Sequence, residues 1–332
     1  MAYTTIDNPE LYFQTKIYTG DGNDDRDIVF DVTDTSMQPN MIWSARRDSG
    51  DNISLYDSVR GDGKEFRTAE TGAEYARSDN IQALNSNGFQ VGTDGQVNAD
   101  GGTYVSWAWK ESATAGFGIE TWTGDGNTNR DVAHNMSATP NVAIIKRRDS
   151  ANSWIVYHHA NTSAPLTDYL YLDTTDATSD ASGAWIGVDG TNVELVQVFS
   201  ATNTNTATYA GYFFAEKQGF SKFGSYTGNG NADGEFIYLG FKPAWFLCKN
   251  TQDAGDNWIV HDNKRDTFNV TDAGLAPNTA SAEFTDVDMD FLSNGVKMRN
   301  NTGRANSAKT FIYMAFAESP FVNSNGVPNN AR

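Results

Sequence analysis

The sequence is poor in several residue types whose scarcity limits what the protein can be. It has one cysteine, Cys248, so no disulfide can form within the chain and packing must hold the fold. Because Cys248 lies in an apolar run, we interpret it as a small buried side chain, with a reactive thiol as the alternative. No apolar run reaches about 18 residues and the N-terminus lacks the order of a signal peptide, so we expect neither a membrane span nor a secretion signal.

Basic residues are also scarce. The chain has 24 Lys and Arg against 42 Asp and Glu, a formal net charge of −18. Such a charge repels phosphate backbones, and the short basic groups at 46–47 and 146–148 stand beside acidic residues. We therefore expect no nucleic-acid partner.

The chain contains an internal repeat. Thr-Gly-Asp-Gly-Asn at 19–23 recurs 104 residues later at 123–127, and after the same step at 227–231 with Asn in place of Asp. Later landmarks keep this register: Pro39, Pro140 and Pro243 precede apolar runs, and aromatic segments close each copy at 103–111, 208–216 and 310–318. Such periodicity predicts tandem modules of about 100 residues. The predicted division is an N-terminal arm at 1–14, repeats at 15–115, 116–221 and 222–321, and a C-terminal tail at 322–332.

The local patterns predict strands. Apolar residues seldom recur at helical spacing, whereas short β-branched or aromatic segments bounded by Gly, Asn and Asp are frequent. We expect an all-β chain of three tandem antiparallel β-sandwich or jelly-roll repeats, in which the closing segment of each copy is a central strand buried on both faces. The Gly-Asp-Gly-Asn elements are expected to form tight hairpins, because Gly, Asp and Asn tolerate positive φ. A similar turn is expected late in each copy, at Asn87-Gly88, Asp94-Gly95, Asp189-Gly190 and Asn294-Gly295.

Few residues indicate chemistry. Asp and Asn alternate over 21–27 as in a calcium loop, but Arg26 and Val32 stand where a helical calcium hand needs Gly and Glu. A hydrogen-bonded polar turn is the preferred interpretation, and an irregular calcium site is the alternative. The neighbours His158 and His159 would point to opposite faces of a strand, so they cannot readily bind one metal ion together. We expect no catalytic residue, metal or cofactor, although a carboxylate pair acting on a sugar stays open as a third hypothesis.

Two groups of aromatic and apolar residues are candidate contact sites. Trp122 and Trp185 adjoin Gly-rich turns, so they are the tryptophans expected to be exposed and to stack on sugar rings, with burial as the competing interpretation. Leu11, Tyr12 and Phe13 are too apolar for a free terminus, and we expect them to dock on a neighbouring repeat or a partner. The Asn- and Pro-containing tail is expected to be loosely held.

These landmarks resemble proteins of marine tailed bacteriophages that infect cyanobacteria and Pelagibacter, whose virion proteins contain repeated concanavalin-like β-sandwich modules. The first copy carries the resemblance, and the other two depart from it at His158-His159-Ala160 and at 262–265. Its matching segments are 18–22, 41–43 with Arg46-Arg47, 55–61 (Leu-Tyr-Asp-Ser-Val-Arg-Gly), 87–89 and 104–110 (Tyr-Val-Ser-Trp-Ala-Trp-Lys).

The resemblance implies a non-enzymatic structural protein, made in the host cytoplasm and located in the virion, that decorates the capsid or belongs to the tail or fibre. Its partners would be other phage virion proteins. The alternative is a carbohydrate-binding host-recognition module of the phage tail, with a host surface glycan as its partner.

Overall fold

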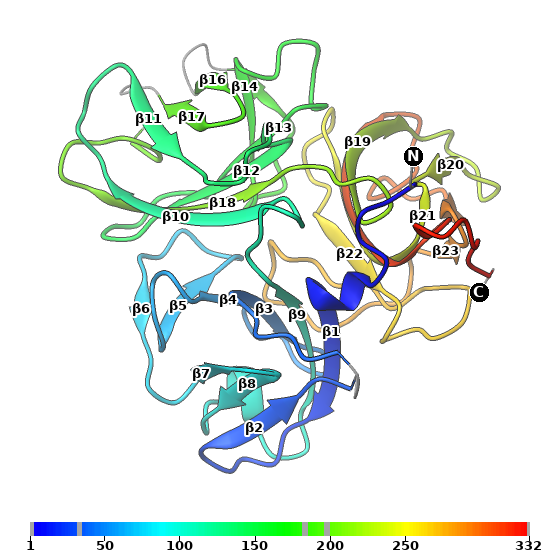
Figure 1. The fold of residues 1–332 in the computed structure, drawn as a ribbon, viewed down its shortest axis with the longest axis horizontal. Helices are drawn as coiled ribbons and strands as arrows, with labels where there is room; N and C mark the ends of the chain where they lie inside the picture. Colours follow the sequence, from blue (N-terminus) through cyan, green and yellow to red (C-terminus); the bar gives the residue numbers. More distant parts are fainter. Residues whose placement is uncertain (1–2, 32–34, 181–184, 196–199, 331–332) are drawn as a thin grey trace.

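The computed structural model describes residues 3–31, 35–180, 185–195 and 200–330 (Figure 1). Apart from the 3-10 turn η1 (Pro9–Leu11) and the single helical turn α1 (Gly95–Asn98), the named elements are strands, and all their pairings are antiparallel. The prediction of an all-β chain of antiparallel sheets is confirmed.

The first third of the chain forms one large and one small sheet, which we call unit 1. The large sheet has the order β1 (Phe13–Thr19), β9 (Thr103–Trp109), β3 (Met41–Arg46), β4 (Ser54–Asp57), β5 (Lys64–Arg67) and β6 (Tyr75–Ala76). The small sheet has the order β2 (Arg26–Val29), β8 (Gly88–Val91) and β7 (Ile81–Asn85).

The second third, unit 2, follows the same plan. Its large sheet has the order β10 (Phe117–Thr123), β18 (Thr208–Phe214), β12 (Val142–Arg147), β13 (Ile155–His158), β14 (Asp168–Tyr171) and β15 (Ser179–Asp180). Its small sheet has the order β11 (Arg130–Ala133), β17 (Asn192–Leu195) and β16 (Trp185–Val188).

Unit 3 keeps this order with a shorter large sheet. The large sheet has the order β19 (Ser221–Thr227), β25 (Thr310–Pro320), β21 (Phe241–Asn250) and β22 (Ile259–Asp262). The small sheet has the order β20 (Phe236–Tyr238), β24 (Gly295–Met298) and β23 (Met289–Leu292). Isolated bridges, Val260 to Leu275 and Gly274 to Phe284, stand where the other units have their last two strands.

The Gly-Asp-Gly-Asn elements do not form hairpins, which corrects the prediction. Each carries the chain from the large sheet to the small sheet of its unit, as between β1 and β2. Buried Asn98 holds the first turn, because its Oδ1 accepts from the N–H of Asp21 (3.1 Å) and its Nδ2 donates to the carbonyl of Asn23 (2.8 Å). A Cβ on Gly20 would lie 2.1 Å from the carbonyl oxygen of Ala99, so this close approach requires glycine.

The other two turns are held in the same way. Asn203 accepts from the N–H of Asp125 (3.1 Å), and Asn306 accepts from the N–H of Asn229 (3.2 Å). Hairpins do form at Asn87-Gly88 and at 294–295, and also at 189–190, where the sequence also predicted turns.

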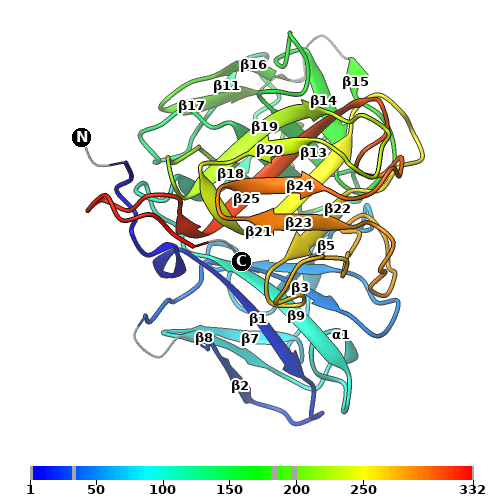
Figure 2. The ribbon, with the colours of Figure 1, turned by 90° about the vertical axis from the view of Figure 1, so that its right-hand side faces the viewer.

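The central strands of each large sheet are buried on both faces. One face packs on the small sheet of its own unit, around a separate apolar cluster in each unit. The other face points to a common centre, around which the three units lie as three lobes (Figures 1 and 2). On β9, for example, Ala108 belongs to the cluster of unit 1, whereas Trp107 and Trp109 belong to the central one. The largest aromatic core is therefore shared between the units, in addition to the smaller cluster inside each one.

Candidate functional site

The inner faces of the three large sheets meet in one aromatic core, which we call the junction. Trp109 of unit 1 packs edge-on against Trp245 (ring centroids 5.6 Å apart) and Phe316 (5.7 Å) of unit 3. Phe214 of unit 2 contacts Phe316 at 6.1 Å. An apolar cavity of about 20 Å³ lies at the centre, lined by residues of all three units. The junction is a packed core, and a cavity of this size is too small for an organic ligand.

Hydrogen bonds join the three units in a closed circle. Tyr212 of unit 2 donates from its hydroxyl to Asp57 of unit 1 (2.7 Å), and Trp107 of unit 1 donates from Nε1 to Asp262 of unit 3 (3.0 Å). His158 of unit 2 bonds through Nε2 to the carbonyl of Tyr313 in unit 3 (3.1 Å). Asp57, His158 and Asp262 all end their strands, and Trp107 and Tyr212 occupy the same position of β9 and β18. The carbonyl of Tyr313 belongs to the residue before that position in β25. The three contacts thus join corresponding strands, and the units are arranged cyclically.

At the contact between units 1 and 2, a series of ion pairs continues from the hydrogen bond between Tyr212 and Asp57. Asp57 holds Arg60, and both side chains are fully buried. Arg60 reaches Glu74 (3.4 Å), and Glu74 forms a two-bond ion pair with Arg148 of unit 2 at 2.9 and 3.2 Å. Each buried charge therefore has an opposite charge beside it, as burial requires.

The contact between units 1 and 3 has the same charge pattern. Buried Asp262 holds buried Arg265, and Arg265 reaches Glu283 (3.1 Å). Glu283 forms the two-bond ion pair with Arg47 of unit 1, both bonds being 2.9 Å. The guanidinium of Arg265 also lies 5.6 Å from the centre of the Trp107 ring.

The contact between units 2 and 3 has the same backbone geometry without the charges. The N–H of Thr178 donates to the carbonyl of Thr251 (2.9 Å), as Glu74 does to Arg148 and Glu283 to Arg47. The Thr178 hydroxyl donates to Asn161 (2.7 Å), which takes the place of the buried arginines.

His158 takes the place of the aspartates at this contact and is uncharged. Its Nδ1 accepts the N–H of Ala160 (3.2 Å), so the ring nitrogen that would carry the extra proton is already an acceptor. Burial lowers the pKa of His158 to about 3. Four positions carry charged side chains at the other two contacts. At this contact all four carry neutral residues: His158, Asn161, Thr178 and Thr251.

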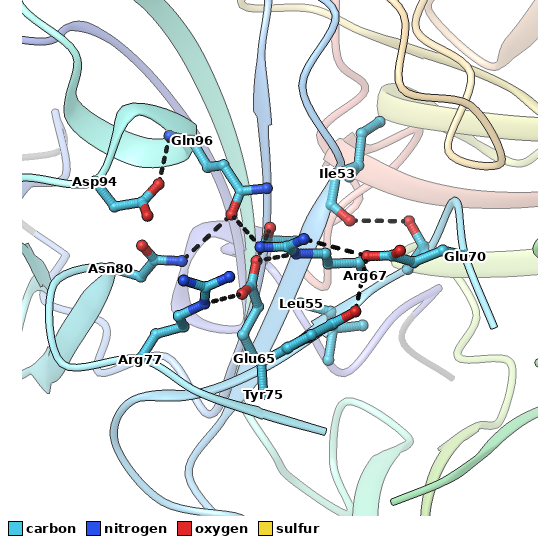
Figure 3. A network of polar contacts seen from close by, with 12 residues as sticks. Ile53, Leu55, Glu65, Arg67, Glu70, Tyr75, Arg77, Asn80, Asp94 and Gln96 are labelled. Carbon is cyan, nitrogen blue, oxygen red and sulfur yellow. Dashed lines mark hydrogen bonds and ion pairs between the residues drawn. The ribbon is translucent and has the colours of Figure 1, made fainter. Parts of the chain in front are cut away.

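Unit 1 has a further polar network at the edge of its large sheet (Figure 3). Fully buried Glu65 on β5 accepts from the hydroxyl of Ser54 (2.7 Å) and from Arg67 (3.1 Å), and it lies 3.5 Å from Arg77. Arg67 lies 4.5 Å from the centre of the Tyr75 ring on β6. Two guanidinium groups thus neutralise one carboxylate and tie β5 to β6. Glu65 therefore holds strands together rather than facing a substrate.

In the turns at 19–23 and 123–127, the aspartate side chains bond to groups within or next to the turn. Asp21 accepts from the N–H of Asn23 (3.0 Å) and lies 3.4 Å from Arg26. The N–H of Asn127 is the main cause that lowers the pKa of Asp125 to about 2. Among the described residues, no group of three or more His, Cys, Asp or Glu is placed to hold a metal ion. A hydrogen-bonded polar turn, the preferred interpretation from the sequence, is what the structure shows.

Trp122 and Trp185 are not exposed, so the expectation that they meet a glycan at the surface is wrong. Their exposed fractions are 8% and 3%, because both lie in the cluster between the two sheets of unit 2. Trp122 stacks on Tyr209 (5.6 Å) and donates from Nε1 to the carbonyl of Thr202 (3.1 Å), and Trp185 packs on Tyr157 (5.6 Å). The remaining six tryptophans are buried as well: Trp43, Trp107, Trp109, Trp154, Trp245 and Trp258.

The N-terminal arm docks on unit 3 of its own chain. Phe13 is buried in the junction, where it stacks on Phe316 (5.3 Å), and Tyr12 packs on Phe220 (6.0 Å). Of the three residues predicted to meet a partner, Leu11 is the one whose side chain is exposed. Phe13 and the half-buried Tyr12 are committed to contacts within the molecule.

The C-terminal tail is held rather than loose, which corrects the prediction. The N–H of Ser324 donates to Asp7 of the arm (2.7 Å), and Asn329 donates to the carbonyl of Ser293 (2.9 Å). Figure 2 shows the dark blue arm and the red tail running together at one side of the molecule. The arm and tail therefore brace each other beside unit 3.

Cys248 is buried on β21, as interpreted from the sequence, and burial raises the pKa of its thiol to about 12. A thiol with that pKa is a weak nucleophile near neutral pH. Among the described residues, none of the helices is long and apolar enough to cross a membrane.

A partial signal for the charged contacts between units is present in the sequence. Asp57 and Arg60 are three residues apart, and the same spacing recurs at Asp262 and Arg265. Their further partners, Glu74 and Glu283, share the short pattern Ala-Glu-aromatic at 73–75 and 282–284, which is too brief to stand out in the sequence. Only the folded arrangement shows that these residues belong together.

None of the curated proteins compared with the chain matches it. A family model described as a domain of unknown function, DUF7483, matches residues 8–320. The match starts within the arm and runs through all three units as one domain, so it includes every contact of the cyclic arrangement. The chain therefore belongs to the DUF7483 family.

Proposed function

We propose that this chain is a non-enzymatic structural protein of a tailed-phage virion, either a capsid decoration or a component of the tail or fibre. The observation that carries the proposal is the closed circle of contacts between corresponding strands of units 1, 2 and 3. One chain thereby presents three similar sheets around a common core, as a cyclic trimer does with three chains. Such a molecule suits a three-fold or quasi-three-fold position on a particle.

The chemistry inside the molecule supports this proposal. The buried acids Asp57, Asp262 and Glu65 each accept bonds from an arginine and from a second side chain, which commits them to holding strands and units together. The net charge of −18 also keeps the surface from adhering to DNA while a particle is assembled. The resemblance of the first copy to phage virion modules points the same way.

Cryo-electron microscopy of the intact particle tests the proposal, together with mass spectrometry of purified particles. We expect the chain in the particle, with three-lobed density of one molecule at each three-fold or quasi-three-fold position or within the tail. Particles made without the gene serve as the control and should lack that density. A chain that stays in the soluble fraction of infected cells and is absent from purified particles would contradict the proposal.

The carbohydrate-binding alternative loses the residues on which it was based. Trp122 and Trp185 offer no exposed ring face for a sugar. A glycan site would have to use other aromatic residues.

A further inference from the structure

Unit 3 departs from the other two units on the outer side of its small sheet. Phe236 and Tyr238 on β20 are 44% and 49% exposed, while Ile237 between them is buried. The buried residues Ile28 and Val132 occupy the place of Ile237 in β2 and β11. Aligned in this way, the outward positions hold Asp27 and Val29 in unit 1 and Asp131 and Ala133 in unit 2. Two outward aromatic residues are thus a property of unit 3 alone.

The two rings lie on one face of the strand. Residues two apart in a strand point the same way and are separated by roughly 7 Å. Exposed aromatic side chains forgo part of the free energy of burial, so a pair of them on one surface indicates a contact with something else.

A pocket of about 370 Å³ lies beside Tyr238, between β20, β19 and the arm. Figure 2 shows β19 and β20 next to each other. The ammonium of Lys222 donates to the carbonyl of Tyr238 (2.7 Å) and lies 5.2 Å from the centre of its ring. Tyr3 closes another side by donating to the carbonyl of Gly240 (2.8 Å). The exposed side chains of Glu216 and Gln218 complete the rim.

We propose that this pocket, together with the ring of Phe236 two residues before Tyr238 on the same face of β20, binds a neutral oligosaccharide. An aromatic ring offers an apolar surface to the C–H face of a pyranose, and the carboxylate, amide, ammonium and phenol groups of the rim suit its hydroxyls. A strongly anionic sugar would be repelled, because the molecule carries a net charge of −18. This inference goes beyond the structural role and does not rest on it.

The geometry favours a sugar over an added peptide strand. β20 is an edge strand, and edge strands can accept a further strand through their backbone groups. The carbonyl of Tyr238 already accepts the Lys222 ammonium, so a peptide at this edge would have to compete for it.

The test uses the full chain and the double variant Phe236→Asp/Tyr238→Ala. These are the residues that unit 2 carries at the same positions, so the strand should tolerate them. The probes are neutral gluco-, galacto- and manno-configured trisaccharides, measured by saturation-transfer NMR and by calorimetry. We expect the wild type to bind at least one of them with a Kd of about 1 mM, and the double variant to bind it about tenfold more weakly or not at all, at unchanged Tm.

The matched control is Val29→Ala, which changes the position equivalent to Tyr238 in unit 1 and should leave binding unchanged. Sedimentation of the unliganded protein accompanies these measurements. The proposal is overturned if the wild type binds none of the probes, if the double variant binds as well as the wild type, or if anionic oligosaccharides bind more tightly. It is also overturned if the wild type is a dimer that the double variant dissociates, because the rings would then join two copies of the chain.

Discussion

At the scale of single residues, three asparagine side chains hold the turns between the large and small sheets: Asn98, Asn203 and Asn306. Each is buried and bonds the backbone of a turn about 75 residues earlier in the chain. A buried amide in this role fixes the passage from one sheet to the other. The three turns look alike because each meets the same amide.

Removing one of these amides should be costly. In Asn98→Ala, the N–H of Asp21 and the carbonyls of Asn23 and Gly92 lose a partner. We expect the free energy of unfolding to fall by about 2–4 kcal/mol, measured by urea denaturation. The control Asn23→Ala changes an exposed side chain of the same turn and should cost about 0.5 kcal/mol or less. Equal effects of the two changes would contradict this role for Asn98.

The buried histidines should make stability depend on pH. Burial lowers the pKa of both His158 and His261 to about 3 in the folded protein, whereas an unfolded histidine titrates near its ordinary value of 6.5. As the pH falls below 6.5 the unfolded chain binds protons that the folded chain does not, so stability is lost progressively toward pH 3. From pH 7 to pH 5 each histidine should cost roughly 2 kcal/mol.

Urea unfolding of the wild type and of His158→Asn at pH 7 and pH 5 checks this. The variant should lose less stability between the two pH values than the wild type, by roughly the contribution of one histidine. An identical loss in both proteins would mean that His158 does not stay neutral in the folded state.

At the scale of elements, the strands β4, β13 and β22 end at the contacts between units. Each contact has either the full set of charged residues or the full set of neutral ones. The ends of two of these strands carry an aspartate with its arginine three residues on, and the third carries His158 with Asn161. A buried charge without its partner costs several kcal/mol, so no single member of the charged set can be replaced alone.

The neutral contact between units 2 and 3 provides a test. His158→Asp alone should lower the free energy of unfolding by about 3–5 kcal/mol, because it buries a carboxylate without a cation. The quadruple variant that adds Asn161→Arg, Thr178→Glu and Thr251→Arg recreates the charged set and should recover most of that loss. Thermal and urea unfolding of both variants measure the coupling. A quadruple variant no more stable than the single one would show that the contacts are not equivalent.

Sequence patterns predicted the strands and the late hairpins because these depend on neighbours a few residues apart. The closing strands of 103–109 and 208–214 were correctly expected to be buried on both faces. The Gly-Asp-Gly-Asn turn was misread as a hairpin because its partner Asn98 is 77 residues from Asp21. Trp122 was misread as exposed because the ring of Tyr209 that covers it is likewise distant in sequence.

At the scale of the whole molecule, the shared junction makes the units depend on one another. Removed from the other two, unit 2 would expose the inner face of its large sheet, which includes Ile144, Tyr212 and Phe214. An apolar surface of that kind drives association or prevents folding. The family match over 8–320 agrees with a single indivisible domain.

Two measurements follow from this dependence. The full chain should unfold in one cooperative transition, with fluorescence and circular dichroism giving the same midpoint. A fragment of residues 116–220 should be either unfolded or associated in sedimentation experiments. A folded monomeric fragment, or three separate transitions of the full chain, would show that each unit is stable by its own core.

The cyclic contacts also limit how many modules such a chain can carry. Each contact joins two different surfaces, and the third contact brings the series back to its start, which is the condition for a closed ring. A chain with two modules would keep one surface of each kind uncovered, and a fourth module would find no open place. Duplication of whole modules is therefore a poor route to new variants of this protein. Diversification is left to outward segments such as residues 267–270, where Phe268 is 78% exposed and can change without disturbing the ring.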